Sequence, residues 1–308
     1  MVKMAMVDCD VGVDDALALI LAFHSPELKV KAITSVNGNV PENQVFDNIQ
    51  KVLSFIHPQP TPFIARGADR PLKGQSIYAH SVHGMDGLGG ATIERREAEE
   101  WWRLFPGKAD ELITEMARQH PGELTLVATG PLTNLAIAVQ KDLEGMQKLK
   151  AVVVMGGAVR TKGNITPHAE FNIFVDPLAA KIVFESGLPV TLVPLDVTHQ
   201  VFLTPQLIEE RVKPLNNAFS QFLIKATGYD SLAHRFHPGE IFHLHDPLAV
   251  GVAINPDLVK KQKLPIHVET EEREHFGLTS ESPGSPNVDV CLEVDAKGFL
   301  ELFLSRLG

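Results

Sequence analysis

Apolar runs of strand length alternate with segments of helical length along most of the chain. The first run begins at Met4 and leads, through a glycine-containing turn, into the apolar segment 16–22, which is long enough for a helix. The alternation continues with a strand-like run at 28–36, a helical pattern at 41–53 and a short run at 63–67. Because strands that alternate with helices are typical of a parallel sheet, this pattern predicts an α/β fold.

The second half of the chain contains apolar runs that do not alternate with polar residues. Residues 124–129, 151–155 and 190–195 are such runs, rich in β-branched side chains. A strand that is buried on both faces of a parallel sheet has this composition. The alternating segments 264–270 and 288–294 predict late strands at the periphery. The sequence therefore predicts a mostly parallel, Rossmann-like central sheet with helices on both faces.

Composition narrows the class of protein. The chain has 308 residues, 44% of them hydrophobic, and its net charge of −10 argues against a nucleic-acid partner. Its longest apolar stretch is too short to span a bilayer, and no signal peptide is recognisable. Two cysteines, Cys9 and Cys291, predict reduced thiols and a cytoplasmic protein. Since no linker or repeat divides residues 1–308, we expect a single domain.

Four aspartates lie where the first predicted strand meets the first helix. Asp8 and Asp10 alternate along the strand end and so share one face. Asp14 and Asp15 lie in the turn or the first helical turn, where either can cap the helix. One cap needs one side chain, and four adjacent carboxylates repel one another unless a cation or shifted protonation compensates. Oxygen ligands favour Ca²⁺ or Mg²⁺.

Further polar residues follow other predicted strands, at the sheet edge where ligands bind in such folds. Asn39 follows the second strand, and the glycine-rich loop 78–90 contains histidines and an aspartate. The segment 163–177 holds amides and carboxylates that could bind vicinal hydroxyls, although each alone is as readily a turn residue or, for Asp176, a helix cap. Other candidates lie in the last third of the chain: Asp196, His199, His234, His237, His243, His245 and Asp246.

Together, these segments resemble the nucleoside hydrolase family, in particular its inosine-uridine preferring type. A lone Asp-x-Asp pair would be weak support, because phosphatases and glycosyltransferases also use paired aspartates. The resemblance covers nearly the whole chain, and its segments follow in the family's order. They are Asp8-x-Asp10-x-Gly12-x-Asp14-Asp15, Asn39, His83-Gly84, residues 129–134, residues 155–157, residues 164–176 and His245-Asp246.

The resemblance implies a hydrolase that cleaves the N-glycosidic bond of ribonucleosides, such as inosine and uridine, with one Ca²⁺ at the bottom of its pocket. It implies that carboxylates of Asp10, Asp15 and Asp246 and the backbone carbonyl of Thr129 ligate the ion, while Asp8 supports the loop. It also implies a homodimer or homotetramer that acts on small molecules. The residues that it places around the ribose and the pocket are Asp14, Asn39, Met155, Asn164, Glu170 and Asn172.

The same resemblance suggests the chemistry. Cleavage develops an oxocarbenium-like ribosyl centre, and water attacks its opposite face. Asp10 matches the base that takes the proton of a calcium-activated water. His245 matches the acid that protonates the leaving base, and His83 matches a histidine beside the same pocket. Histidine suits this role because its ordinary pKa is near neutrality.

Base preference is suggested by two features. The two tryptophans, Trp101 and Trp102, are adjacent in a charged stretch that we expect to be helical, away from the His83 loop. This favours the type with a histidine acid over a purine-specific type that stacks the base between tryptophans. Residues 85–87 read Met-Asp-Gly, where pyrimidine-preferring members have Glu-Ser-Gly, so the base-side loop is expected to be tuned differently.

Three alternatives stay open from the residues alone. A phosphohydrolase would use Asp8 as nucleophile, although the threonine or serine and the lysine it needs are not evident. A non-catalytic ribose-binding protein would keep residues 164–172 but would not need both Asp10 and His245. A zinc enzyme could be built on His243-x-His245, because imidazole suits zinc, but the surrounding ligand candidates are carboxylates and carbonyls.

Overall fold

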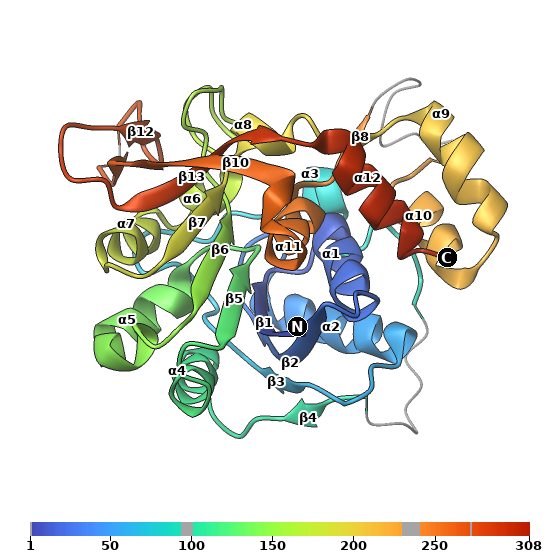
Figure 1. Cartoon of the computed structure of the whole chain (residues 1–308), viewed down its shortest axis with the longest axis horizontal. Helices are drawn as coiled ribbons and strands as arrows, with labels where there is room; N and C mark the ends of the chain where they lie inside the picture. The colour runs from blue at the N-terminus through green and yellow to red at the C-terminus, as the bar shows by residue number, and fades with distance from the viewer. Residues whose placement is uncertain (1, 94–100, 230–240, 272) are drawn as a thin grey trace.

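The structure, a computed structural model, describes residues 2–93, 101–229, 241–271 and 273–308. In this part of the chain, nine strands form one central sheet in the order β10-β13-β7-β6-β5-β1-β2-β3-β4 (Figure 1). Every neighbouring pair is parallel except β10 with β13. The strands are β1 (Lys3–Cys9), β2 (Leu28–Ser35), β3 (Phe63–Ala65), β4 (Arg103–Leu104), β5 (Leu124–Ala128), β6 (Ala151–Met155), β7 (Val190–Val193), β10 (Val259–Leu264) and β13 (Val288–Val294).

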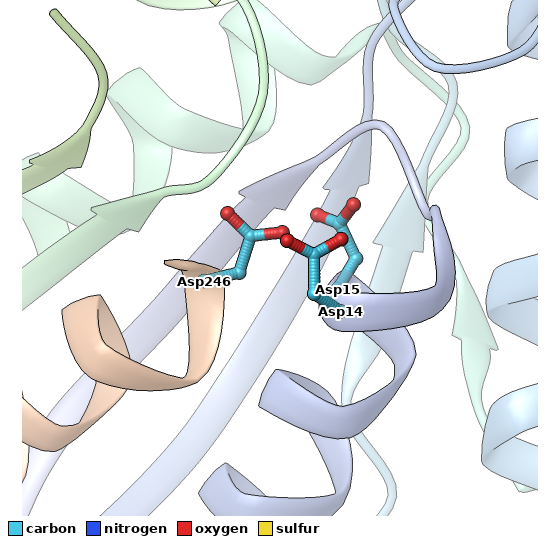
Figure 2. A group of neighbouring side chains, drawn as sticks. All are labelled: Asp14, Asp15 and Asp246. Atoms are coloured by element: carbon cyan, nitrogen blue, oxygen red, sulfur yellow. The ribbon is translucent and has the colours of Figure 1, made fainter. Parts of the chain in front are cut away.

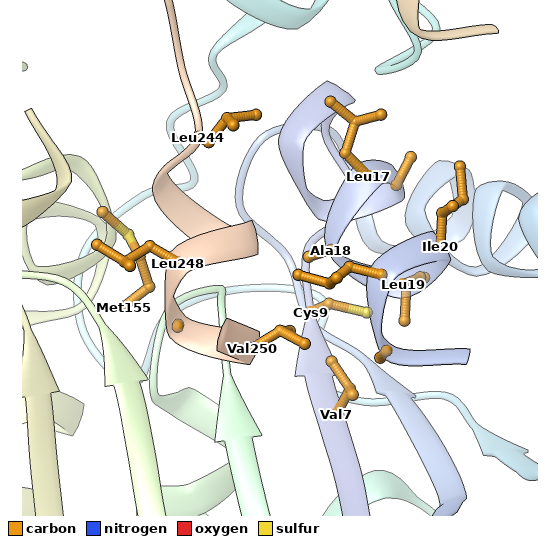
Figure 3. Packing of buried hydrophobic residues seen from close by; sticks show 14 of the residues in the cluster. Val7, Cys9, Leu17, Ala18, Leu19, Ile20, Met155, Leu244, Leu248 and Val250 are labelled. Carbon is orange, nitrogen blue, oxygen red and sulfur yellow. The ribbon is translucent and has the colours of Figure 1, made fainter. Parts of the chain in front are cut away.

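Helices cover both faces of the sheet, and alternate residues of β1 show why. Val7 and Cys9 belong to one buried apolar cluster, whereas Met6 belongs to the other. The first cluster packs α1 (Val13–Phe23), α2 (Glu42–Ile56), α10 (Ala218–Ala226), α11 (His245–Ile254) and α12 (Ala296–Ser305) against the sheet. Figure 3 shows part of it, where side chains of α1 and α11 pack on those of β1 and β6. The second packs α4 (Ala109–Gln119), α5 (Thr133–Met146) and α7 (Pro177–Glu185) on the opposite face.

Shorter elements complete the described chain, and several lie in loops that border the sheet. No helix in the described ranges is both long and apolar enough to cross a membrane. The short elements are α3 (His80–His83), α6 (Phe171–Val175), α8 (Leu195–Thr198), β8 (Phe202–Leu203), α9 (Pro205–Leu207), a π-helical turn (Ile208–Val212), 3₁₀ turns (Lys213–Leu215 and Pro256–Leu258), β9 (Phe242–His243), β11 (Ile266–Val268) and β12 (Thr279–Glu281).

The predicted α/β fold with a mostly parallel sheet and helices on both faces is confirmed, and two local expectations are wrong. The strand 288–294 is not peripheral, because β13 lies inside the sheet between β7 and β10. The edge strand β10 was missed because its inner residues, 260–263, are lysines and a glutamine, which suit the exposed edge of a sheet. Trp101 and Trp102 are not helical; they come directly before β4, and Trp102 lies in a bend.

Other local expectations are confirmed. Cys9 and Cys291 are both buried and free, as predicted for reduced thiols. Asp176 caps α7, since its carboxylate accepts a hydrogen bond from the backbone N–H of Ala179 at 3.1 Å. The predicted His-bearing loop with His234 and His237 lies outside the described residues.

Candidate active site

A cavity of about 390 Å³ lies at the carboxyl ends of the central strands, where the loops after β1, β2, β5 and β6 converge. Most residues singled out from the sequence line it. These are Asp14, Asn39, His83, Thr129, Met155, Asn164, Glu170, Asn172, His199, His243, His245 and Asp246. The remaining lining residues were not singled out individually, although six of them lie in the loop 78–90 or the segment 163–177 marked in the sequence. They are Tyr78, Ala79, Ser81, Val82, Ile165, Phe171, Ile241 and Phe242.

Three carboxylates converge at one end of the cavity. Asp14 and Asp15 begin α1, and Asp246 lies in the first turn of α11 (Figure 2). One carboxylate oxygen from each lies within 4.8 Å of one from each of the others, and all three residues are buried. The packing of α1 against α11 thus joins residues more than two hundred positions apart in the sequence. The three oxygens are close enough to hold one metal ion.

Asp10 lies next to this group and is fully buried. Its Oδ2 accepts a hydrogen bond from the backbone N–H of Asn39 at 2.7 Å, and its Oδ1 has no partner among the described residues. A Cβ added to Gly38 would lie 2.0 Å from Oδ2 of Asp10, so only glycine fits there. The turn after β2 therefore closes directly over the Asp10 carboxylate.

Asp15 is held by three neighbours. Its Oδ2 accepts hydrogen bonds from the Gly12 backbone at 2.8 Å and from Nδ2 of Asn39 at 3.1 Å. Its Oδ1 accepts one from the Thr129 hydroxyl at 2.7 Å. Asn39, expected only to bind ribose, therefore also bridges Asp10 and Asp15, a role that its position after β2 did not reveal.

The acidic cluster is electrostatically strained. Burial, reinforced by the neighbouring carboxylates, raises the pKa values of Asp10 and Asp246 well above the ordinary range. Burial raises the pKa of Asp14 to about 6 and also raises that of Asp15. No lysine or arginine is among the described residues that line the cavity. Because Oδ1 atoms of Asp10 and Asp14 are buried without described partners, the cluster fits a hard cation that would satisfy them.

The Asp8 side chain connects the end of β1 to β2 and to the start of α5. Its Oδ1 accepts hydrogen bonds from Oγ1 of Thr34 at 2.6 Å and from Nδ2 of Asn134 at 2.7 Å. Burial raises its pKa to about 7. Asp8 is fully buried and, like Asp10 and Asp15, is not among the described residues that line the cavity.

The loops after β5 and β6 supply the polar side of the cavity. Nδ2 of Asn172 donates to the carbonyl oxygen of Thr129 at 2.7 Å, and it lies 3.3 Å from that of Met155. Oδ1 of Asn164 accepts from the backbone N–H of Phe171 at 2.9 Å. These amides therefore brace the cavity wall in addition to lining it.

Glu170 is both a helix cap and a wall residue. One carboxylate oxygen accepts from the backbone N–H of Asn172 at 2.9 Å. The other accepts from those of Gly157 at 2.9 Å and Ile173 at 3.1 Å. Burial raises the pKa of Glu170. The carboxylate thus ties the loop after β6 to the start of α6, a structural role beside the one expected from the sequence.

His83 lies in α3, at the edge of the acidic cluster. Its Nδ1 accepts a hydrogen bond from the backbone N–H of Val13 at 3.1 Å and lies 3.9 Å from Oδ1 of Asp14. A backbone N–H can only donate, so Nδ1 carries no proton and a neutral ring has its hydrogen on Nε2. Burial lowers the pKa of His83 to about 4. His83 is therefore suited to donate a hydrogen bond rather than to act as a charged acid.

His245 belongs to a group of three histidines. Its Nδ1 lies 2.7 Å from the hydroxyl oxygen of Thr198. Its ring centroid lies 5.3 Å from that of His243 and 5.8 Å from that of His199. Burial, together with the neighbouring histidines, lowers the pKa of His245 to about 3. Among the described residues, the ring nitrogens of these histidines do not come as close together as the carboxylate oxygens of Asp14, Asp15 and Asp246. This disfavours a zinc site built on His243 and His245.

Neither tryptophan is among the described residues that line the cavity, and the ring of Trp101 lies against that of His57 with ring centroids 4.3 Å apart.

The Met-Asp-Gly sequence at residues 85–87, which departs from the Glu-Ser-Gly of pyrimidine-preferring members, has a structural role. The Asp86 carboxylate accepts hydrogen bonds from the backbone N–H groups of Leu88 and Gly90, and the Asp86 carbonyl accepts one from Nδ2 of Asn48 at 2.8 Å. These bonds fold the loop behind His83.

Comparison with known proteins agrees with this arrangement. The sequence model of the family described as "Inosine-uridine preferring nucleoside hydrolase" matches residues 5–301. A pyrimidine-specific ribonucleoside hydrolase, RihA, from Salmonella gallinarum is 36% identical over 309 aligned residues, which cover 98% of this chain and 97% of the relative.

Solved structures show the same fold along the whole chain. The plant nucleoside hydrolase PpNRh1 superposes with a TM-score of 0.90 at 31% identity, covering 99% of this chain and 98% of that protein. A purine-preferring ribonucleoside hydrolase from Gardnerella vaginalis superposes with a TM-score of 0.87 at 31% identity and the same coverage.

Fold and sequence thus define the class: the protein is an N-glycosyl hydrolase that acts on ribonucleosides. Within that class, the chain belongs to the inosine-uridine preferring nucleoside hydrolase family.

Proposed function

We propose that this enzyme hydrolyses inosine, uridine and related ribonucleosides with one Ca²⁺ in the acidic cluster, Asp10 as the base and His245 as the leaving-group acid. The observation that supports this most strongly is a single cavity with buried carboxylates at one end and neutral histidines on its wall. Its volume of about 390 Å³ is within the range usual for small-molecule sites.

The proposed ligands of Ca²⁺ are the carboxylates of Asp10, Asp15 and Asp246 and the backbone carbonyl of Thr129. The close approach of Asp14 to Asp15 and Asp246 adds a further carboxylate to this environment. The unpartnered carboxylate oxygens and the absence of a lysine or arginine from the described cavity wall support a divalent cation. When bound, Ca²⁺ supplies charge compensation and lowers the pKa of water.

Asp14, Asn39, Asn164, Glu170 and Asn172 are proposed to bind the ribose hydroxyls, with Met155 against the sugar. Each of these residues lines the cavity. Because the wall is braced by its own hydrogen bonds, the sugar meets groups that are already oriented. Binding energy from the hydroxyls can then favour the flattened, oxocarbenium-like ribosyl centre of the transition state.

In the proposed reaction, water attacks C1′ as the bond from C1′ to the base nitrogen breaks. Asp10 takes one proton of the water, and its unpartnered Oδ1 is the free acceptor. The base leaves with the electron pair of the broken bond and receives a proton on the side where His83 and His245 lie. His245 is the proposed donor to the base: the neutral ring gives up its Nε2 proton as it regains one from water, and the proton taken by Asp10 returns to solvent. His83 assists through a hydrogen bond from Nε2.

We also propose a cytoplasmic homodimer or homotetramer without a nucleic-acid or membrane partner. The buried, free cysteines support the cytoplasmic compartment, and the net charge of −10 argues against a nucleic-acid partner. The oligomer is proposed from the family resemblance. Light scattering coupled to size-exclusion chromatography measures the mass of the assembly. A mass that stays at one chain at micromolar concentration contradicts the oligomer.

The activity is tested by measuring ribose release from inosine, uridine, guanosine, cytidine and adenosine in phosphate-free buffer containing H₂¹⁸O. Hydrolysis places ¹⁸O in the ribose and none in the base. The ranking of kcat/KM across the five substrates measures the base preference. Absence of ribose from every substrate, with folded protein, contradicts the proposal.

A further inference from the structure

Thr198 makes a contact that the reaction outlined above does not use. It ends α8 and is fully buried, and its Oγ1 lies 2.7 Å from Nδ1 of His245. The short helix contacts β7, β13 and α11, so the hydroxyl comes from a well-packed element. The contact connects the loop after β7 with the start of α11.

The direction of this hydrogen bond follows from the available acceptors. Among the described residues, Nδ1 of His245 is the one hydrogen-bond partner of the Thr198 hydroxyl. If Nδ1 carried the hydrogen and donated it, the buried hydroxyl would have no acceptor for its own hydrogen, which is unfavourable. The hydroxyl therefore donates to Nδ1, and the hydrogen of the neutral ring is on Nε2.

His245 lines the cavity, and no described residue makes a hydrogen bond to its Nε2. We infer that Thr198 is a positioning residue that holds His245 as the Nε2–H tautomer, with that N–H directed at the leaving base. The inference rests on the proposed function, in which His245 donates a proton to the leaving base. It adds the residue that selects which ring nitrogen carries the hydrogen.

His83 provides an independent parallel on the same cavity. Its Nδ1 also accepts a hydrogen bond, from the backbone N–H of Val13, so its hydrogen is on Nε2 as well. One tautomer is set by a backbone amide, which no side-chain substitution removes. The other depends on a single hydroxyl and is therefore open to mutation.

The test compares Thr198→Val, which keeps the shape but removes the hydroxyl, with Thr198→Ser, which keeps the hydroxyl. Kinetics are measured on uridine and on p-nitrophenyl riboside, whose leaving group needs no proton. Since general acids contribute about 10²–10⁴-fold, we expect Thr198→Val to lower kcat on uridine by at least about tenfold. On the nitrophenyl riboside the change stays below about threefold, and Thr198→Ser restores uridine turnover.

A matched control is Thr227→Val in the segment after α10. Thr227 is buried, and its hydroxyl donates to the Leu223 carbonyl at 2.8 Å, away from the cavity. Loss of the Thr227 hydroxyl should leave the turnover of both substrates unchanged. In a double-mutant cycle, Thr198→Val should add no further loss on uridine in a His245→Gln background.

Nitrogen NMR of ring-labelled histidine separates this inference from the proposed function. The His245 signals, identified by their loss in His245→Gln, should show an unprotonated Nδ1 and a protonated Nε2, with the balance altered in Thr198→Val and retained in Thr198→Ser. A protonated Nδ1 in the wild type, or equal kinetic losses in the two Thr198 variants, overturns the inference. If His245→Gln slows both substrates equally, the leaving-group role fails, while the NMR result still decides the tautomer.

Discussion

Replacing Asp246 by asparagine should have opposite effects on stability with and without calcium. In metal-free protein, the substitution removes one of three carboxylates whose oxygens lie within 4.8 Å of one another. It should therefore raise the melting temperature. In wild-type protein, added Ca²⁺ should raise the melting temperature, and in the variant this rise should be largely lost because a proposed ligand is missing.

The magnitudes follow from the distance and the length of the chain. At 4.8 Å and an effective dielectric constant of about 20, two unit charges repel by about 3.5 kcal/mol. Protonation already relieves much of this repulsion in the metal-free cluster. We therefore expect Asp246→Asn to raise the free energy of unfolding by about 1–2 kcal/mol. With an unfolding entropy of about 2.1 cal/mol/K per residue, this is about 2–3 °C. Calcium at about 1,000 times its dissociation constant stabilises by about 4 kcal/mol, or about 6 °C.

Differential scanning calorimetry at pH 7.5 and constant ionic strength, in chelator and then in a calcium titration, measures both effects. The matched control is Asp69→Asn, whose side chain is 80% exposed and pairs with Arg70 at 3.7 Å. This substitution should change neither the melting temperature in chelator nor the rise that calcium produces. The reasoning is refuted if wild-type protein shows no calcium-dependent rise, or if the Asp246 variant melts lower without metal and keeps the full calcium response.

Three further predictions concern the same site. Asp10→Ala should abolish ribose release while leaving the protein folded, and a variant that retains more than about a tenth of wild-type kcat contradicts the base-and-ligand assignment. His245→Ala should slow inosine far more than p-nitrophenyl riboside in steady-state assays, and equal losses remove its role as acid. In metal-free protein, the raised pKa values of Asp14, about 6, and Asp8, about 7, favour the protonated native state. Stability should therefore increase as pH falls from 8 to about 6.5, above the range in which the lowered pKa values of His83 and His245 oppose the gain. A melting temperature that falls from pH 8 to 6.5 in chelator contradicts the strained cluster.

The sequence predicted the central fold because its signals are local. Non-alternating β-branched runs mark β5, β6 and β7, and the first strand and helix are separated by one glycine-containing turn. The acidic cluster was predictable in part, since Asp14 and Asp15 are adjacent in sequence. That Asp246 joins them depends on the packing of α1 against α11, which no local pattern encodes, so Asp246 was expected there only through the family resemblance.

Features that arise from long-range contacts were not predictable from single segments. Strand β10 has an exposed, lysine-rich interior and reads as a loop until it pairs with β13. The bridging role of Asn39 depends on two carboxylates from another loop. The contact of Thr198 with His245 joins residues 47 positions apart, and nothing in the sequence around Thr198 indicates it.

The measurement that tests the central claim most directly is the kcat for uridine as a function of Ca²⁺ bound per chain. Protein is stripped with chelator, reloaded in steps and assayed for ribose release, with bound metal determined by mass spectrometry. The account predicts no turnover in stripped protein and full recovery at one Ca²⁺ per chain, with neither binding nor recovery in Asp246→Asn. Full turnover by protein that holds no metal would contradict it.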